Sequence, residues 1–113
     1  MECIFCGIVT GEVPAEIVYQ DEEFIAFSDV APQAPKHLVI IPKSHIPSVA
    51  DLGVEHQGLA GRLILLAREL ARREGVADSG YRLAMNCGAD AGQVVPHLHL
   101  HLIGGRRLSG RLG

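Results

Sequence analysis

The sequence predicts an α+β fold, in which an antiparallel sheet of about five strands carries one long helix and a short N-terminal helix. Short apolar, β-branched segments separated by turn residues occur on both sides of a single long segment with helical periodicity. Strands joined mostly by hairpins, with one helix inserted on one side, are typical of α+β proteins with antiparallel sheets.

The N-terminal part of the chain is expected to form a short helix followed by three strands. Residues 4–9 are a short apolar turn or helix, which Thr10 and Gly11 end. The predicted strands span residues 17–20, 24–29 and 37–41. The segment 31–36 contains two prolines and is therefore predicted to be an extended loop. Pro42 ends the third strand.

One long helix is expected at residues 55–74, with Gly75 as its C-terminal stop. Its apolar stripe consists of Leu59, Leu63, Leu66 and Leu70. Its polar side consists of Arg62, Arg68, Arg72 and Arg73. Four further apolar residues widen the stripe: Ile64, Leu65, Ala67 and Ala71. The wider sector indicates either a second buried side at a dimer interface or a helix deep in its own core.

The last two predicted strands are residues 81–87 and 98–103. Histidine and leucine alternate from residue 97 to residue 102, which covers most of the second strand. The histidines are His97, His99 and His101, and the leucines are Leu98, Leu100 and Leu102. The two-residue period of a strand places the imidazoles on one face and the leucines on the other. The leucine face belongs against a core. The histidine face gathers groups that titrate near neutral pH, which is useful for chemistry or metal binding.

A single metal ion held by all three histidines does not fit this spacing. On an extended strand the Cα atoms of His97 and His101 lie about 13 Å apart, whereas zinc–nitrogen bonds are about 2 Å. One ion can therefore take one or two of the rings. Three like groups in register are also unfavourable as a purely structural feature, because adjacent protonated rings repel. The pattern favours either catalysis or a metal site that takes one or two of the rings.

Composition limits the remaining classes of function. The chain has 113 residues and a formal net charge of -3, so we expect one domain over residues 1–113 with no nucleic-acid partner. No apolar run is long enough to span a bilayer and no signal-peptide pattern is evident, which predicts a cytoplasmic protein without a membrane partner. The three cysteines do not suggest a disulfide framework.

Taken together, the segments resemble the histidine-triad (HIT) superfamily of nucleotidyl hydrolases and transferases. The resemblance covers almost the whole chain and is closest to the HINT-like branch, of purine nucleoside phosphoramidase type. It rests on residues 4–5, 27–35, 37–46 and 80–82, on Asn86, and on Gly92-Gln93 leading into the triad. The third triad position is His101, where the nucleotidyl-transferase branch looks to have glutamine.

The resemblance implies a HIT fold and a hydrolase that cleaves purine nucleoside phosphoramidates, or related adenylates, at the α-phosphorus. His99 would be the nucleophile, forming a nucleotidyl-histidine that water then hydrolyses. His101 would donate hydrogen bonds to the phosphate and protonate the leaving group. His37 would orient and polarise the triad, which His97 completes. Catalysis itself would need no metal.

The resemblance also implies a nucleotide site. The backbone N–H groups of Gly92, Gln93 and Val94 would face the phosphate oxygens, and Asn86 would contact the phosphate. The carboxylate of Asp29 would accept hydrogen bonds from the ribose hydroxyls. The slot for the base would consist of Ile4, Phe5, Phe27, Val30 and Leu38, positions that ordinary core packing explains equally well.

One residue and the C-terminal tail depart from the family pattern. Many HINT enzymes carry a serine where this chain has Val94, so a side-chain proton donor near the scissile bond is missing. The tail after Gly105 lacks the tryptophan-containing end that family members use near the leaving group. These departures favour reduced activity toward phosphoramidates or a different leaving-group preference.

A second site is expected at the N-terminus. Cys3 and Cys6 form a C-x2-C pair, a spacing that lets two thiolates hold one zinc ion from a turn. A redox pair or two core thiols are alternatives, and the sequence lacks the thioredoxin-like context that a redox pair requires. The resemblance to bacterial relatives implies His45 and His97 as the other two ligands of a structural zinc. The metal would then fix His97 in one tautomer.

Family members usually form homodimers, so the resemblance implies a homodimer here. Two other functions remain open: a nucleotide-binding or scaffolding protein with little turnover, and a dinucleoside polyphosphate hydrolase. The compact segment 29–35 favours the HINT-like branch over the latter.

Overall fold

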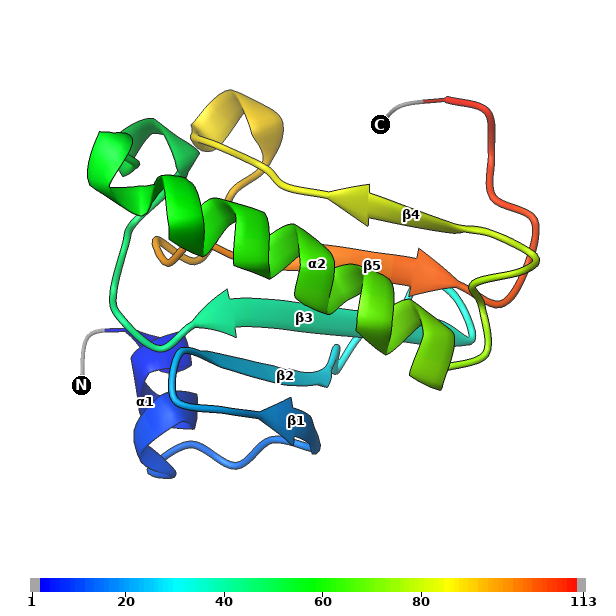
Figure 1. Ribbon diagram of the computed structural model, residues 1–113, viewed down its shortest axis with the longest axis horizontal. Helices are drawn as coiled ribbons and strands as arrows, with labels where there is room; N and C mark the ends of the chain where they lie inside the picture. Colours follow the sequence, from blue (N-terminus) through cyan, green and yellow to red (C-terminus); the bar gives the residue numbers. More distant parts are fainter. Residues whose placement is uncertain (1–2, 112–113) are drawn as a thin grey trace.

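The structure is a computed structural model that describes residues 3–111, and it contains one five-stranded antiparallel sheet in the order β1-β2-β3-β5-β4 (Figure 1). The strands are β1 (Ile17–Gln20), β2 (Phe24–Ser28), β3 (Lys36–Pro42), β4 (Tyr81–Ala84) and β5 (Leu100–Gly104). The helices are α1 (Ile4–Thr10) and α2 (Gln57–Arg73). Short 3-10 turns span Val49–Asp51, Val54–His56 and Ala89–Ala91. The predicted α+β fold is confirmed.

The sheet has two differently covered faces. Helix α2 packs across one face, where buried side chains of β2, β3 and β5 meet those of the helix (Figure 1). On the sheet these are Phe24, Ala26, Leu38, Ile40, Leu100 and Leu102. Helix α1 lies against the other face through Ile8, which packs with Ile25, Phe27, Val39 and Ile41. The alternation of strand side chains thus supplies two separate cores.

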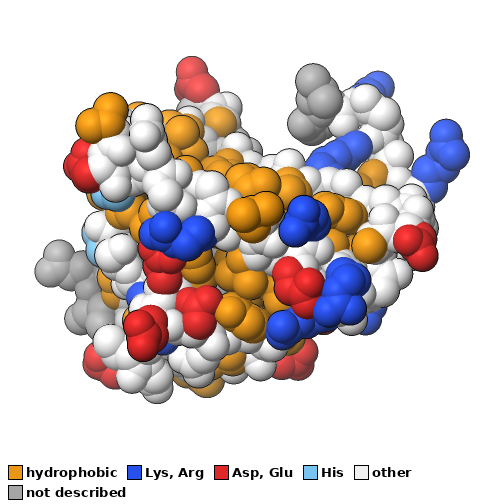
Figure 2. All heavy atoms as spheres, viewed as in Figure 1, with side chains coloured by type: hydrophobic (Ala, Val, Ile, Leu, Met, Phe, Trp, Pro, Cys, Tyr) orange, Lys and Arg blue, Asp and Glu red, His pale blue; other side chains and the backbone are white. Residues whose placement is uncertain are grey.

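Helix α2 begins two residues later than expected, because residues Val54–His56 form a 3-10 turn ahead of it. Its core-facing residues are Leu59, Leu63, Ala67, Leu70 and Ala71. Ile64 and Leu65 keep 45% and 54% of their surface exposed. Hydrophobic side chains accordingly appear among charged ones over the front of the molecule (Figure 2). No helix within residues 3–111 is long and apolar enough to cross a membrane.

Strand β5 starts at Leu100, two residues later than expected, so His97 and His99 lie just before it. The physical reason is a change of hydrogen-bonding partner. The Leu98 N–H donates to the carbonyl of Ile46 (2.6 Å) rather than to β3. Strand β4 correspondingly ends at Ala84, opposite His101, instead of continuing to residue 87 as expected.

Candidate active site

The three alternating histidines occupy the face of the sheet that carries α1. His101 pairs with Val39 of the α1-side core, while Leu98, Leu100 and Leu102 are buried against α2. The predicted separation of imidazoles and leucines is therefore confirmed, although only His101 lies within β5. His97 is fully buried, His99 retains 9% of its surface, and His101 is partly exposed.

A backbone carbonyl fixes the tautomer of His99. Its Nδ1 lies 2.7 Å from the carbonyl oxygen of His97. A carbonyl only accepts hydrogen bonds, so in the neutral ring Nδ1 carries the proton and Nε2 has the lone pair. The Phe5 ring and the imidazole pack edge-to-face, with ring centroids 5.1 Å apart. The ring is held in one orientation, and in its neutral form Nε2 is the nitrogen free to react.

His37, from β3, connects Asp29 to His101. The backbone N–H of Gln33 donates to His37 Nδ1 (3.1 Å), so the proton of the neutral ring is on Nε2. That Nε2 lies 2.9 Å from His101 Nδ1 and 3.3 Å from Asp29 Oδ2. The His101 Nδ1 therefore accepts, and the proton of neutral His101 is on Nε2. The Asp29 carboxylate is itself held by the Ala31 N–H, which donates to Oδ1 (2.9 Å).

The surroundings of His101 favour its neutral form in the free protein. Burial lowers the pKa of His101 below its ordinary value, and the neighbouring His99 and His37 lower it further. The Asp29 carboxylate, 3.9 Å from His101 Nδ1, opposes these effects. An anionic group placed beside the ring would add to the effect of Asp29 and favour protonation.

Four potential metal ligands meet at the base of α1. The side chains of Cys3, Cys6, His45 and His97 place one donor atom each within 4.8 Å of one another. His97 Nε2 lies 2.9 Å from the Pro42 carbonyl and therefore carries the ring proton, which leaves the Nδ1 lone pair directed at the cluster. This Nδ1 lies 3.4 Å from Cys3 Sγ and 3.2 Å from His45 Nδ1.

An apolar cavity of about 280 Å³ lies between α1 and the sheet, and Phe5 in its lining also contacts His99. Its lining includes four of the expected slot residues and Asp29: Ile4, Phe5, Phe27, Val30 and Asp29. Leu38 is different, because its side chain is 2% exposed and belongs to the core on the α2 face. This placement corrects the expectation for Leu38, which is not part of the slot. The sequence contained a signal for this placement, because Leu38 and His37 are neighbours on one strand and their side chains point to opposite faces of the sheet.

The Gln93 side chain connects the loop before the triad to the segment after β3. It accepts from the Gly88 N–H (2.8 Å) and donates to the Pro47 carbonyl (2.8 Å). The N–H of Gly92 donates to Ala89 O and that of Gln93 to Gly88 O, so these two groups are occupied within the loop. That they face a phosphate stays a prediction. Among the described residues, the N–H of Val94 has no such acceptor.

Asn86 and Val94 lie at the two ends of segment 86–94, between β4 and the triad. Asn86 is half-buried just beyond β4, and Val94 is 88% exposed. Sequence reasoning missed the groups that orient the imidazoles, namely the carbonyls of His97 and Pro42 and the N–H of Gln33. These are backbone groups, which any residue type supplies, so the sequence held no signal for them.

Known proteins are similar to this chain in sequence and in fold. The purine nucleoside phosphoramidase of Escherichia coli (strain K12) is 50% identical over 107 residues, which are 95% of this chain and 90% of that protein. The crystal structure of a HIT family hydrolase from Legionella pneumophila Philadelphia 1 has a TM-score of 0.96 and 44% identity, covering 98% of this chain and 99% of that one.

A HIT family hydrolase from Clostridium thermocellum has a TM-score of 0.94 and 42% identity, covering 97% of this chain and 96% of that one. A family model described as "HIT domain" matches residues 10–108. The resemblance inferred from the histidine pattern is thereby confirmed, and the protein belongs to the HIT domain family.

Proposed function

We propose that the protein is a hydrolase that cleaves purine nucleoside phosphoramidates, or related adenylates, at the α-phosphorus. The Escherichia coli relative carries the name of this activity, and the two solved relatives are named hydrolases. The observation that carries the proposal is the state of His99. Its Nδ1–H donates to the His97 carbonyl, so that Nε2 keeps a lone pair beside a second, hydrogen-bonded imidazole.

In the proposed reaction the lone pair of His99 Nε2 forms a bond to phosphorus, and the bond from phosphorus to the leaving nitrogen breaks. The leaving nitrogen keeps that electron pair and takes the proton of His101 Nε2. The bound phosphate favours a second proton on His101, at Nδ1, and the His37 Nε2–H then donates to Asp29 Oδ2, which lies 3.3 Å away. Water then attacks phosphorus, the phosphorus–Nε2 bond breaks with its electron pair returning to His99, and a water proton returns to His101. The products are an amine and a nucleoside monophosphate.

The nucleotide is proposed to bind in the cavity between α1 and the sheet. Its apolar lining, with Phe5 and Phe27 in edge-to-face contact, suits a planar purine base. The Asp29 carboxylate at its margin still offers lone pairs to ribose hydroxyls, because each carboxylate oxygen accepts more than one hydrogen bond. The Val94 N–H and the Asn86 side chain are proposed donors to the phosphate.

The cluster at the base of α1 is proposed to bind a structural zinc ion through Cys3, Cys6, His45 and His97. Tetrahedral zinc separates a nitrogen ligand from a sulfur ligand by about 3.5 Å. The spacings of Cys6 Sγ from His45 Nδ1 (3.2 Å) and from His97 Nδ1 (3.6 Å) fit this value. Burial raises the pKa of the Cys6 thiol, and a bound cation offsets that effect by stabilising the thiolate. The zinc would join α1 to the catalytic segment, with no part in the reaction.

We also propose a homodimer, formed through the outer side of α2 and the adjoining edge of the sheet. Ile64 and Leu65 are large apolar residues exposed on α2, and β4 is an edge strand. This favours the first explanation of the wide apolar sector, a second side buried against a partner. Sedimentation equilibrium decides the matter, with twice the 12.1 kDa chain mass expected and a single chain mass contradicting it.

Turnover of adenosine 5′-phosphoramidate, measured as release of AMP, tests the proposed activity. We expect turnover by the wild-type protein and a loss of at least about a hundredfold in His99→Ala. His56→Ala is the matched control, because His56 lies in the turn before α2 and is expected to leave turnover unchanged. Nucleotide binding without turnover would instead indicate the binding or scaffolding protein. Preferential cleavage of dinucleoside polyphosphates would indicate the sister activity.

A further inference from the structure

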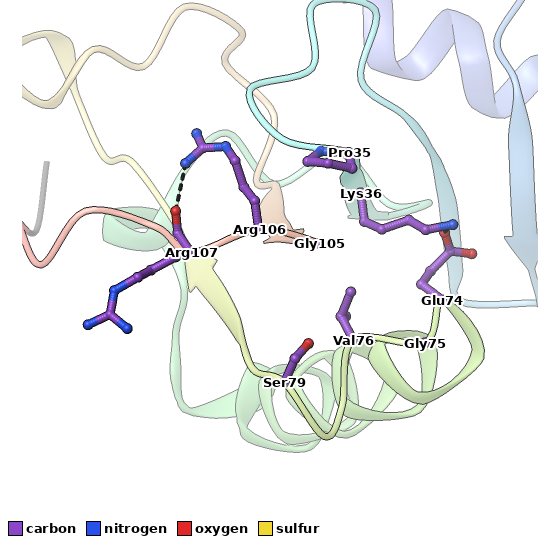
Figure 3. Close-up of a pocket in the computed structure, with 9 residues that line it drawn as sticks. All are labelled: Pro35, Lys36, Glu74, Gly75, Val76, Ser79, Gly105, Arg106 and Arg107. Carbon is purple, nitrogen blue, oxygen red and sulfur yellow. Dashed lines mark hydrogen bonds and ion pairs between the residues drawn. The ribbon is translucent and has the colours of Figure 1, made fainter.

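The chain after β5 makes a contact with the catalytic site that the proposed reaction has not used. Arg106 lies in this tail, and its guanidinium bonds to the proline-containing loop that precedes β3. Figure 3 draws Arg106 with its other hydrogen bond, to the Arg107 carbonyl. Its Nη2 donates to the carbonyl of Gln33 (2.7 Å), and its Nη1 donates to the carbonyl of Arg107 (3.0 Å). One guanidinium thus connects the tail to the loop.

The tail is held against the loop by close backbone packing. Gly105 has φ +95°, in the left-handed region that favours glycine. A Cβ at this position would lie 3.0 Å from Pro35 Cβ and 3.4 Å from the backbone nitrogen of Lys36. Figure 3 shows Gly105 and Arg106 at the margin of a cavity of about 580 Å³, across from Pro35. Glycine therefore permits the approach that brings Arg106 within reach of Gln33.

The residue that Arg106 holds is also the one that sets the protonation of His37. The N–H of Gln33 donates to His37 Nδ1, which places the ring proton on Nε2, and this Nε2 faces His101 Nδ1 at 2.9 Å. If the Gln33 N–H moved away, His37 would be free to carry its proton on Nδ1. It would then present a lone pair to the lone pair of His101, and the contact would be lost.

We propose that Arg106 is a positioning residue, which holds the backbone of Gln33 so that His37 keeps its proton on Nε2 and orients His101. The catalytic consequence rests on the function proposed above, whereas the tautomer of His37 does not. Arginine suits the role because its planar guanidinium reaches two carbonyls at once, which the single ammonium of lysine does less well. Groups that orient a catalytic imidazole in this way fix both its tautomer and its ring direction.

The test combines NMR of the histidine side chains with kinetics on the intact 113-residue chain. In wild type, the ¹⁵N shifts of His37 should be those of an unprotonated Nδ1 and a protonated Nε2. In Arg106→Ala both shifts should move toward the average of the two tautomers. With adenosine 5′-phosphoramidate, kcat should fall about tenfold while KM changes less than about twofold, because orientation rather than binding is lost. Arg106→Lys should recover part of both effects.

Two further variants separate this role from a general effect of charge or folding. Arg111→Ala removes a similar charge farther along the tail and should resemble wild type in both measurements. Gly105→Ala, which pushes the tail off Pro35, should reproduce the His37 shifts of Arg106→Ala. Wild-type His37 shifts in Arg106→Ala would overturn the proposal, whatever the kinetics. If the wild-type protein does not turn over the substrate, the proposed function fails, and the NMR comparison still decides the role of Arg106.

Discussion

At the scale of single residues, backbone groups select one tautomer for each of three imidazoles, with the proton on Nδ1 in His99 and on Nε2 in His97 and His37. Carbonyls take the Nδ1–H of His99 and the Nε2–H of His97, while a backbone N–H occupies Nδ1 of His37. Each ring is left with one defined nitrogen for its task. Four histidines on one face can therefore coexist without four like charges.

The first prediction concerns the pH dependence of stability. The pKa of His101 is lowered in the folded protein, so between its unfolded and folded values the unfolded chain binds more protons. The free energy of unfolding should therefore fall as the pH drops below about 6.5, the ordinary pKa of histidine. Urea unfolding at pH 7.5 and 5.5 measures this, and His101→Gln should show a smaller difference than wild type. An equal difference in both proteins would remove His101 as a cause.

The second prediction concerns Val94, an exposed residue beside the triad. A serine there would add a hydroxyl donor near the scissile bond. Val94→Ser should raise kcat for adenosine 5′-phosphoramidate by about three- to tenfold, the value of one added hydrogen bond in the transition state. Val94→Ala controls for the loss of the valine side chain and should not share the gain. No increase in Val94→Ser would contradict the proposed effect of this position.

At the scale of elements, much of the fold was predictable and several boundaries were not. The two-residue alternation in β3 and β5, and the helical spacing of the leucines in α2, correctly indicated strands, helix and core faces. The start of β5 was predicted two residues too early. The Leu98 N–H donates to the Ile46 carbonyl instead of to a neighbouring strand, and this contact joins segments distant in sequence. Hydrogen-bond partners of this kind have no local signature.

The third prediction tests the core between α2 and the sheet. Leu63 is 1% exposed and packs among the buried leucines and isoleucines of that core. Leu63→Ala should lower the free energy of unfolding by about 3 kcal/mol, because it removes buried methyl groups and leaves a cavity. Val54→Ala, at a position that is 81% exposed, should change it by less than about 0.5 kcal/mol. Urea denaturation of both variants gives the comparison, and similar losses in the two would contradict the packing described.

The fourth prediction tests the cluster at the base of α1. Protein purified without chelator should contain about one zinc per chain, and Cys6→Ser should contain much less. Removing the metal should lower the free energy of unfolding by about 2–4 kcal/mol, since zinc binds the folded chain preferentially. Elemental analysis and thermal unfolding with and without chelator measure both effects. A zinc content near zero in wild type would contradict the assignment.

At the scale of the whole molecule, the fold brings distant segments to one site. Asp29 and His37 flank the proline-containing loop, His45 follows β3, Phe5 comes from α1 and the triad precedes or lies in β5. Their residue types and spacing were enough to predict most of this assembly through family resemblance. The tail contact of Arg106 with Gln33 was not predictable, since it uses a backbone carbonyl and an approach that only the folded chain defines.

The proposed mechanism requires His99 to act as a covalent nucleophile, and trapping the intermediate tests this role most directly. The protein is mixed with an isotopically labelled adenylate donor, quenched at alkaline pH to protect the phosphorus–nitrogen bond, and mapped by mass spectrometry of its peptides. We predict an adenylyl group on His99 that disappears on longer incubation and does not form in His99→Ala. Label that persists in His99→Ala, or that maps to another residue, would contradict the mechanism.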